Sequence, residues 1–416
     1  MRISKRCGSN RRLLLPLMVL GLMILLAVVT LNWFDTESQM PLAWHVDPNH
    51  RKLVHSFVRG VLSNQCRPAF ARKGVEARLQ ISSHVTDPFL WRDTLLTPEM
   101  FKYPPPFGFC DMHGKLKDVL NLLPAQPEQL KKECRRCVVM GNGGILRGLE
   151  LGTLLDQFDV VIRLNSGPLR NYSKDVGNRT SIRMSYPEGS PKVWEDVDPE
   201  LQFVAVVYKA VDFNWIRAMI NRQRVVSCKA HHQKHEQNIN LKKKGMKSGN
   251  VQTWLSDLKC KFRHCLLLYL TLDLFLFQSL WDWLFFWQKV PEKIPVDLSK
   301  FRLLNLEIIR QMAMDLLAYP SPQQRLWGWD QNVPTMGISA LNLATYLCDE
   351  VSLAGFGYNL SQKEMPLHYY DNIPMTAMLE QNMHNVDRER ALLQSLVREG
   401  TVSDLTGGLH CTFCPS

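Results

Sequence analysis

Charged residues are absent from one long stretch of this 416-residue chain, residues 13–33. About 20 apolar residues are enough for a helix to cross a bilayer. No small-x-small cleavage site follows the stretch, which disfavours a signal peptide that is removed. Five basic residues precede it, whereas Asp35 and Glu37 follow it. We therefore expect a cytosolic tail over residues 1–12, a transmembrane signal anchor over residues 13–33, and the remaining chain in the lumen.

The sequence also lacks the glycine spacing of a dinucleotide-binding turn. In G-x-G-x-x-G the third glycine follows the second by three positions, whereas here Gly148 follows Gly143 by five. A nucleotide-dependent oxidoreductase would also need an acidic ribose ligand about 20 residues further on, and this spacing argues against that class. The same glycines in another arrangement can still let a backbone approach a phosphate, so the turn alone does not separate a nucleotide site from a tight structural turn.

Around these glycines the hydrophobic pattern predicts a βαβ unit. An apolar run at residues 137–140 leads into Gly141-Asn142-Gly143-Gly144, a helix-like pattern covers residues 145–151, and a second buried-strand pattern covers residues 158–165. Such units build parallel sheets whose ligands lie at the carboxyl ends of the strands, where Asn142 and Asn165 fall. The following helix would offer free amides and the positive end of its dipole to a phosphate.

Segments that include this unit resemble, in order, the four sialylmotifs of animal sialyltransferases. The large motif is matched by residues 134–144, 158–166, 175–180 and 183–189, the small motif by 333–337 and 347–358, the third by 368–371 and the very small by 384–389. The resemblance is greatest to the α2,3 group of this family. Within that group, residues 104–109 and 211–215 look most like members that act on lactosylceramide.

The resemblance implies an α/β fold with a mainly parallel sheet between helices. This would be a variant of the nucleotide-sugar glycosyltransferase (GT-A-like) fold, preceded by the transmembrane helix and a stem. Residues 34–130 have irregular periodicity and are expected to form the stem and the lead-in to the domain. The lumenal catalytic domain is expected over residues 131–416.

Residues 224–278 do not fit the family pattern. They carry ten basic and three acidic residues, so they supply +7 of the net charge of +11, and 11 − 7 leaves +4. A nucleic-acid partner inferred from net charge would rest mostly on this segment, and we expect none. Possible codons at its two ends resemble intron borders, so we hypothesise that it is a translated intron. The cysteines and histidines of this segment lack the spacing of a common zinc finger, which argues against a zinc site. A second membrane crossing near the end of the segment would place the large and small motifs on opposite sides of the membrane, which argues against such a crossing.

The implied reaction is transfer of sialic acid, with inversion, from CMP-sialic acid to the 3-hydroxyl of a terminal galactose. Lactosylceramide is the expected acceptor and a monosialoganglioside the product. The alternatives are galactose termini of glycoproteins or oligosaccharides, or, in another class, an inactive lumenal protein that binds glycan or nucleotide. Family members of this kind are single-pass type II proteins of the Golgi membrane, and a homodimer is a further expectation.

The motifs also imply the roles of individual residues. His384 would be the catalytic base, because a histidine has an ordinary pKa close to the working pH, and Glu389 would orient it or support the local fold. His368 would contact the donor phosphate. The remaining donor contacts are expected from Asn142, Gly143, Asn165, Thr335, Gly337, Gly355, Phe356 and Gly357. Met336 replaces a hydroxyl residue common in related enzymes, which puts one donor hydrogen bond in doubt.

No metal ion or other cofactor is expected. Asp196-Val197-Asp198 has the spacing of the metal-binding pair of many glycosyltransferases, but it lies in a loop rich in proline and acidic residues, which favours a solvated loop. CMP has a single phosphate, which reduces the need for a bridging cation.

In an oxidising lumen the resemblance implies a disulfide between Cys137 and Cys348. A second one between Cys66 and Cys134 is a weaker expectation, because sequence does not determine connectivity. Three N-glycosylation sequons agree with lumenal placement, at Asn171, Asn178 and Asn359.

Overall fold

The computed structural model describes residues 45–79, 87–127, 133–223, 289–321, 332–357, 365–379 and 383–414. The chain divides into two units, Met1–Ala43 and Trp44–Ser416, and all features below belong to the second. The predicted anchor at residues 13–33, the segment 224–278 and Asn359 lie outside the described residues. Within the described ranges, no helix has both the length and the apolar character that a membrane crossing requires.

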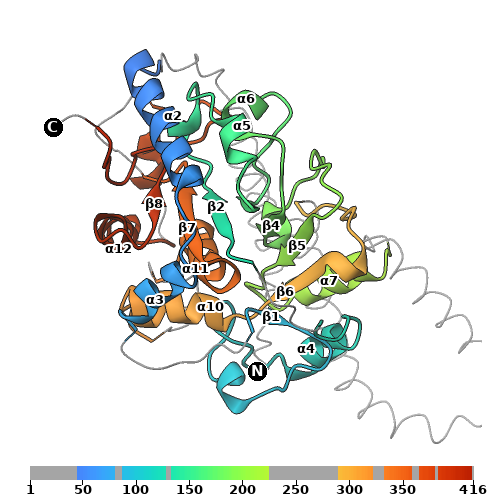
Figure 1. Ribbon diagram of the computed structural model, residues 1–416. Helices are drawn as coiled ribbons and strands as arrows, with labels where there is room; N and C mark the ends of the chain where they lie inside the picture. Colours follow the sequence, from blue (N-terminus) through green and yellow to red (C-terminus); the bar gives the residue numbers. More distant parts are fainter. Residues whose placement is uncertain are drawn as a thin grey trace, which may run out of the picture. The chain divides into compact units, whose positions relative to one another are not determined.

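An eight-stranded sheet runs through this unit in the order β1-β6-β5-β4-β3-β2-β7-β8 (Figure 1). Neighbouring strands are parallel throughout except for β1, which pairs antiparallel with β6 at one edge. The expectation of a mainly parallel sheet is therefore confirmed. The strands are β1 Phe89–Leu90, β2 Arg136–Met140, β3 Val160–Leu164, β4 Ile182–Ser185, β5 Gln202–Ala205, β6 Phe301–Leu304, β7 Glu350–Ala354 and β8 Ser403–Asp404.

Helices cover both faces of the sheet (Figure 1). They are α2 Pro48–Ser63, α3 Phe70–Glu76, α4 His113–Leu120, α5 Gly152–Leu155, α6 Ser173–Val176, α7 Asp212–Ile220, α10 Glu307–Arg310, α11 Met336–Leu347 and α12 Val386–Arg398, with a π-helical turn Gln311–Leu316 after α10. Single 3-10 turns are Pro98–Phe101, Gly144–Leu146, Pro187–Gly189, Leu298–Lys300 and Met375–Leu379.

The apolar run at β2 is continuous because both faces of this strand are buried. Cys137 and Val139 pack into one hydrophobic cluster, which includes residues of α11. Val138 and Met140 point to the opposite face and pack into a second cluster with residues of α2 and α5. Alternate side chains of a strand point to opposite faces, so a run of four apolar residues at the centre of the sheet serves two cores.

Much of the predicted stem and lead-in belongs to the same body. Val54 and Val58 on α2 are fully buried in the second cluster, and the ring of His55 is 2.8 Å from the carbonyl of Leu149. Strand β1 adds to the edge of the sheet. Residues well before position 130 therefore help to build the core that carries the site.

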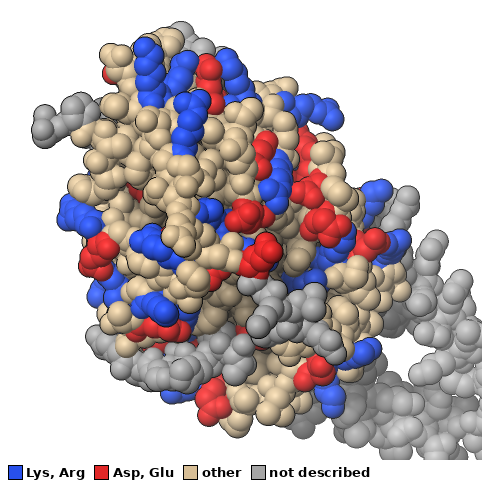
Figure 2. Space-filling model, in the orientation of Figure 1, with Lys and Arg blue, Asp and Glu red and all other residues tan. Residues whose placement is uncertain are grey.

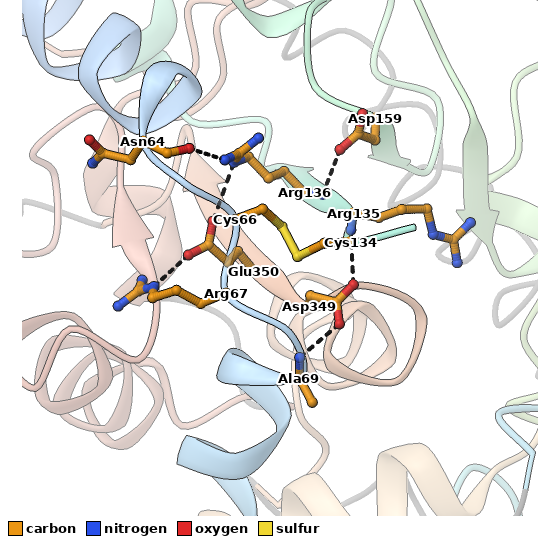
Figure 3. Close-up of a disulfide and its surroundings, with 10 residues drawn as sticks. All are labelled: Asn64, Cys66, Arg67, Ala69, Cys134, Arg135, Arg136, Asp159, Asp349 and Glu350. Carbon is orange, nitrogen blue, oxygen red and sulfur yellow. Dashed lines mark hydrogen bonds and ion pairs between the residues drawn. A yellow bond between two sulfur atoms is a disulfide. The ribbon is translucent and has the colours of Figure 1, made fainter. Parts of the chain in front are cut away.

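A disulfide between Cys66 and Cys134 fastens the segment after α2 to the start of β2 (Figure 3). The carboxylate of Glu350 accepts hydrogen bonds from Arg67 at 2.6 Å and Arg136 at 3.3 Å. The carboxylate of Asp349 accepts from the amides of Ala69 and Arg135, at 2.7 and 2.8 Å (Figure 3). All of these contacts lie at the amino ends of β2 and β7, so they secure the sheet at the end opposite to the one expected to bind ligands.

A second disulfide joins Cys137 in β2 to Cys348 at the end of α11, as the resemblance implies. It connects the large and small motifs across 211 positions of sequence. A third disulfide, Cys411–Cys414, was not expected from the sequence.

The helix expected over residues 145–151 is absent, and this part of the prediction is wrong. Only the 3-10 turn Gly144–Leu146 forms there, and α5 begins later. Gly148 and Glu150 have positive φ angles of 81° and 56°, which a right-handed helix does not allow. Their amides instead donate to the carboxylate of Asp175, both at 2.9 Å.

Candidate active site

A cavity of about 530 Å³ lies at the carboxyl ends of the parallel strands. Its walls come from the loops after β2, β3, β4, β5 and β7, from the first turn of α11, and from residues that precede and begin α12. Every residue predicted for donor binding or catalysis lines it, namely Asn142, Gly143, Asn165, Thr335, Gly337, Gly355, Phe356, Gly357, His368, His384 and Glu389. The fold therefore gathers four motifs that are far apart in sequence around one cavity.

The glycine turn after β2 packs against the protein itself. The amides of Gly141 and Gly143 donate to the carbonyls of Ala354 and Gly355, at 2.8 and 3.0 Å. A Cβ at Gly141 or Gly143 would lie 2.4 or 2.5 Å from the Gly355 carbonyl oxygen. These amides are therefore not available to bind a phosphate. The glycines instead allow the large-motif and small-motif loops to approach each other closely.

Asn142 and Asn165 remain at the cavity after the two central strands. The backbone carbonyl of Asn142 accepts a hydrogen bond from the backbone amide of Tyr369, at 3.0 Å. This bond aligns the third motif beside the large one. Asn165 has a positive φ of 50°, a conformation that asparagine tolerates better than most residues. Its side-chain oxygen accepts from the hydroxyl of Ser185 at 3.2 Å, so the amide group is held at the cavity wall.

His384 lies just before α12 and is mostly buried. Its Nδ1 is 2.7 Å from the carbonyl oxygen of Val333. A carbonyl only accepts, so Nδ1 donates, and a neutral ring then carries its lone pair on Nε2. Burial lowers the pKa of His384 below its usual value, against the smaller opposing effect of that hydrogen bond. The ring is thus held in the neutral state that a general base needs.

His368 is held by a carboxylate and a ring. Its Nδ1 is 2.6 Å from Oδ2 of Asp371, three residues later. The imidazole stacks on Tyr370 with parallel rings 5.1 Å apart. A backbone bridge between His368 and Gly143 sets the ring beside the glycine turn. The carboxylate of Asp371, the ring of Tyr370 and the backbone bridge therefore fix the orientation of His368 together.

Glu389 binds Thr335. Its carboxylate accepts from the Thr335 amide at 2.7 Å and from the Thr335 hydroxyl at 2.6 Å. The Thr335 hydroxyl in turn accepts from the amide of Ile338 at 3.4 Å, as the N-cap of α11. Burial raises the pKa of Glu389 to about 7, although both hydrogen bonds from Thr335 act in the opposite direction. Of its two expected roles, these contacts favour support of the local fold.

The cavity is also lined by Tyr186, Tyr208 and Lys209, to which the sequence interpretation gave no role. The Lys209 ammonium is 2.7 Å from Glu188 Oε1 and 3.1 Å from Asp212 Oδ1. Tyr186 and Glu188 lie inside the matched stretch 183–189, and Lys209 lies just before residues 211–215. Both stretches were singled out in the sequence. The position of Lys209 between them was the signal that could have indicated a place near the site.

The interpretation of Asp196 as part of a solvated loop is wrong. Arg183 donates to Asp196 at 2.7 Å, and both side chains are 1% exposed. Asp198 caps a local turn by accepting from the amide of Glu200 at 2.9 Å. The two aspartates thus have structural partners outside the cavity lining. Among the described residues, no three His, Cys, Asp or Glu side chains are grouped so that they could hold a metal ion.

Asn171 and Asn178 are exposed, as attachment of a glycan requires. On the face drawn in Figure 2, the described lysines and arginines are interspersed with aspartates and glutamates. This face therefore shows no continuous basic stripe among the described residues.

Curated relatives match nearly the whole chain. Lactosylceramide alpha-2,3-sialyltransferase of Pan troglodytes is 43% identical over 95% of this chain and 96% of its own length. The Bos taurus protein of the same name is 41% identical over 95% of this chain and 83% of its own length. CMP-N-acetylneuraminate-beta-1,4-galactoside alpha-2,3-sialyltransferase of Homo sapiens is 28% identical over 83% of this chain and 77% of its own length.

Solved structures share the fold. A crystal structure of a mammalian sialyltransferase matches with a TM-score of 0.51 and 18% identity, over 82% of this chain and 98% of that one. The sequence also matches glycosyltransferase family 29 (sialyltransferase) over residues 89–267 and 272–401. The family match covers most of the chain, and the four motifs meet at one cavity. The chain therefore belongs to glycosyltransferase family 29, the sialyltransferases.

Proposed function

We propose that this enzyme transfers sialic acid from CMP-sialic acid to the 3-hydroxyl of the terminal galactose of lactosylceramide. Relatives with that name are 40% to 43% identical to it, against 28% for the β-1,4-galactoside enzyme. The observation that carries the proposal is the meeting of His384, His368 and the two asparagines at one cavity of the parallel sheet.

In the proposed reaction the acceptor 3-hydroxyl attacks the anomeric carbon of the sialic acid from the side opposite the phosphate. A carbon–oxygen bond forms there, the bond to the phosphate oxygen breaks, CMP leaves, and the configuration inverts. The hydroxyl proton passes to His384 Nε2, which carries the lone pair because Nδ1 donates to Val333. The low pKa of His384 keeps this position unprotonated near neutral pH.

His368 acts on the leaving group. Asp371 accepts from Nδ1 and neutralises the ring when it is protonated. The Nε2–H of that protonated ring donates to the phosphate and stabilises the negative charge that develops as CMP departs. Asn142 and Asn165 hold the donor through their amide groups. No metal ion is proposed, because one phosphate and one carboxylate can be bound by these donors without a bridging cation.

The wider setting follows from the family resemblance. We propose a GT-A-like variant fold, a single-pass type II orientation through residues 13–33, and a Golgi location with the catalytic domain in the lumen. Positive charge before residue 13 supports this orientation. Size-exclusion chromatography of the detergent-solubilised protein tests the expected homodimer.

An assay of sialyl transfer tests the proposal. Purified full-length protein is supplied with CMP-sialic acid and lactosylceramide, with and without a chelator, beside the His384→Ala variant. We expect a product sialylated at the galactose 3-hydroxyl, equal rates with and without chelator, and loss of transfer in the variant. Transfer only to galactose-terminated glycoproteins would instead establish the alternative acceptor, and donor binding without any transfer would indicate an inactive binding protein.

A further inference from the structure

The loop that follows β3 brings Asn165 to the cavity, and a buried arginine holds this loop from behind. Arg183 lies on β4, which is the neighbour of β3 in the sheet. Its Nη1 donates to the carbonyls of Asn165 and Gly167, at 2.7 and 3.3 Å. The guanidinium therefore fixes the backbone of the turn that presents the Asn165 side chain to the cavity.

Asp196 binds the other edge of the same guanidinium. Its Oδ1 accepts from Arg183 Nη2 at 2.7 Å, and its Oδ2 is 2.6 Å from Arg183 Nε. Both side chains are 1% exposed, and neither lines the cavity. An arginine carries its donors along a rigid planar fork, so Arg183 binds the carboxylate with one edge and the two carbonyls with the other. A lysine ammonium lacks this geometry.

A buried ion pair is weak evidence for stability. Removal of two charges from water costs free energy, and well-packed apolar residues in their place are often equally stable or more so. What the pair of Arg183 and Asp196 provides is a fixed direction. A guanidinium bound by a carboxylate along one edge points its remaining donors at a defined place, and here that place is the loop of Asn165.

The same loop contacts other residues of the site. A Cβ added to Gly167 would lie 2.6 Å from Oδ1 of Asn142 and 3.0 Å from the hydroxyl of Tyr369. That hydroxyl donates to the carbonyl of Pro168 at 2.7 Å. Tyr369 directly follows His368 in the third motif. A shift of the loop would therefore disturb both asparagines and the third motif.

The residue before Asp196 holds the far end of the loop. Glu195 Oε2 accepts from the amides of Leu169 and Arg170, at 2.6 and 2.8 Å. Residues 195 and 196 thus secure both ends of the loop 165–170, although they lie outside the stretches that match the four motifs.

We propose that Asp196 is a positioning residue for binding of the donor nucleotide. Its carboxylate orients the guanidinium of Arg183, and the guanidinium sets the backbone of Asn165, so that the asparagine side chain meets the nucleotide. Because Asp196 lies outside the cavity lining, it acts on the affinity for CMP and not on proton transfer. The inference rests on the proposed function, since the nucleotide belongs to the donor of that reaction.

Calorimetric binding of CMP to Asp196→Asn tests this role, with Asp315→Asn as the matched control. Asp315 is 6% exposed and pairs with Arg310 at 3.2 Å, away from the cavity lining. A side-chain amide has only one accepting atom, so it cannot hold both nitrogens of Arg183. We expect CMP to bind about tenfold more weakly to Asp196→Asn, and within about twofold of wild type to Asp315→Asn. Unchanged CMP affinity in folded Asp196→Asn would overturn the role.

A double-mutant cycle shows whether Asp196 acts through Asn165. Asn165→Ala should weaken CMP binding by itself. Adding Asp196→Asn should then weaken it by no more than about a further twofold, because the side chain that the carboxylate positions is gone. A merely structural effect of Asp196 would persist in the Asn165→Ala background. A further loss as large as in the wild-type background would therefore overturn the assignment.

Circular dichroism shows which variants are folded. If Asp196→Asn is not, we use Arg183→Lys, which keeps the buried charge but not the planar fork. It should weaken CMP binding by about tenfold, and unchanged affinity would overturn the role. Loss of the fold in both variants, with Asp315→Asn folded, would also overturn it and leave a structural role only.

Failure of the proposed function gives a different result. CMP binding requires no turnover, so weaker binding by the variants without any transfer by the wild type would remove the proposed function and keep the inference. Wild-type protein that does not bind CMP would overturn both.

Discussion

The carboxylate of Glu389 accepts two hydrogen bonds from one residue, Thr335, whose amide and hydroxyl lie 2.7 and 2.6 Å away. Thr335 is the N-cap of α11 in the small motif, and Glu389 lies in the first turn of α12 in the very small motif. This contact joins the helix that follows His384 to the helix that begins at the donor cavity. It explains how two motifs 54 residues apart can hold one wall of the site.

Replacing Glu389 with glutamine should destabilise the protein. The side-chain amide can accept from only one Thr335 donor, so a buried donor loses its partner, which costs about 1 to 3 kcal/mol. Urea unfolding followed by tryptophan fluorescence measures the change, with Glu399→Gln on the exposed end of α12 as control. Equal stability of Glu389→Gln and wild type would contradict the contact.

The same carboxyl should make stability depend on pH. Its pKa is raised by burial to about 7, above the ordinary value near 4.5 that it regains on unfolding. Its contribution to stability is therefore fully present below about pH 4.5 and is lost as the pH rises through 7. The difference in unfolding free energy between wild type and Glu389→Gln should then shift in favour of the variant from pH 5 to pH 8. A constant difference would show that the carboxyl titrates normally.

The pH profile of transfer should report His384. Burial lowers the pKa of this histidine, so the acid limb of kcat/KM should lie below the ordinary histidine pKa of about 6.5. His384→Gln should reduce kcat by about 10²-fold or more and leave CMP binding intact. An acid limb at or above the ordinary value would argue against a buried neutral base.

The disulfides should differ in their importance. Cys137 and Cys348 are 211 positions apart, whereas Cys411 and Cys414 are three apart. Since loop-closure entropy grows with loop length, replacing the first pair with alanines should cost about 5 kcal/mol, and replacing the second pair less than about 2 kcal/mol. Thermal unfolding of both double variants measures this order, and the reverse order would contradict the entropic account.

Removing residues 224–278 should leave the folded body intact. The two flanks of this segment already contact each other, through a 2.9 Å hydrogen bond from the Trp215 indole to the Pro291 carbonyl. Arg222 and Asp297 form an ion pair at 2.8 Å in the same region. The deleted protein should bind CMP as the full chain does, by calorimetry. Loss of CMP binding would show that the segment is part of the structure and would weigh against a translated intron.

Two central strands could be predicted because a strand that is buried on both faces has a continuous run of apolar residues in the sequence. The apolar runs at residues 137–140 and 158–165 became β2 and β3, with ends shifted by no more than two residues. The helix expected at residues 145–151 failed for a non-local reason. The carboxylate of Asp175 holds Gly148 and Glu150 in positive-φ conformations, and no helical periodicity reports such a partner.

The residues of the site could be predicted where they belong to one of the four motifs. Every residue predicted for donor binding or catalysis lines one cavity, but the contacts of these residues depend on the fold. The glycine turn meets Gly355, more than 200 positions away, and Asp196 is buried against Arg183. Lys209 lies outside the four motifs, and the order of the strands brings it to the cavity.

The most direct test of the central claim is transfer of labelled sialic acid from CMP-sialic acid to lactosylceramide by the purified full chain, with His384→Ala measured in parallel. The account predicts an α2,3-linked product with the wild type, and background rates with the variant at unchanged CMP affinity. Wild-type protein that binds CMP but sialylates neither lactosylceramide nor a galactose-terminated glycoprotein would contradict it.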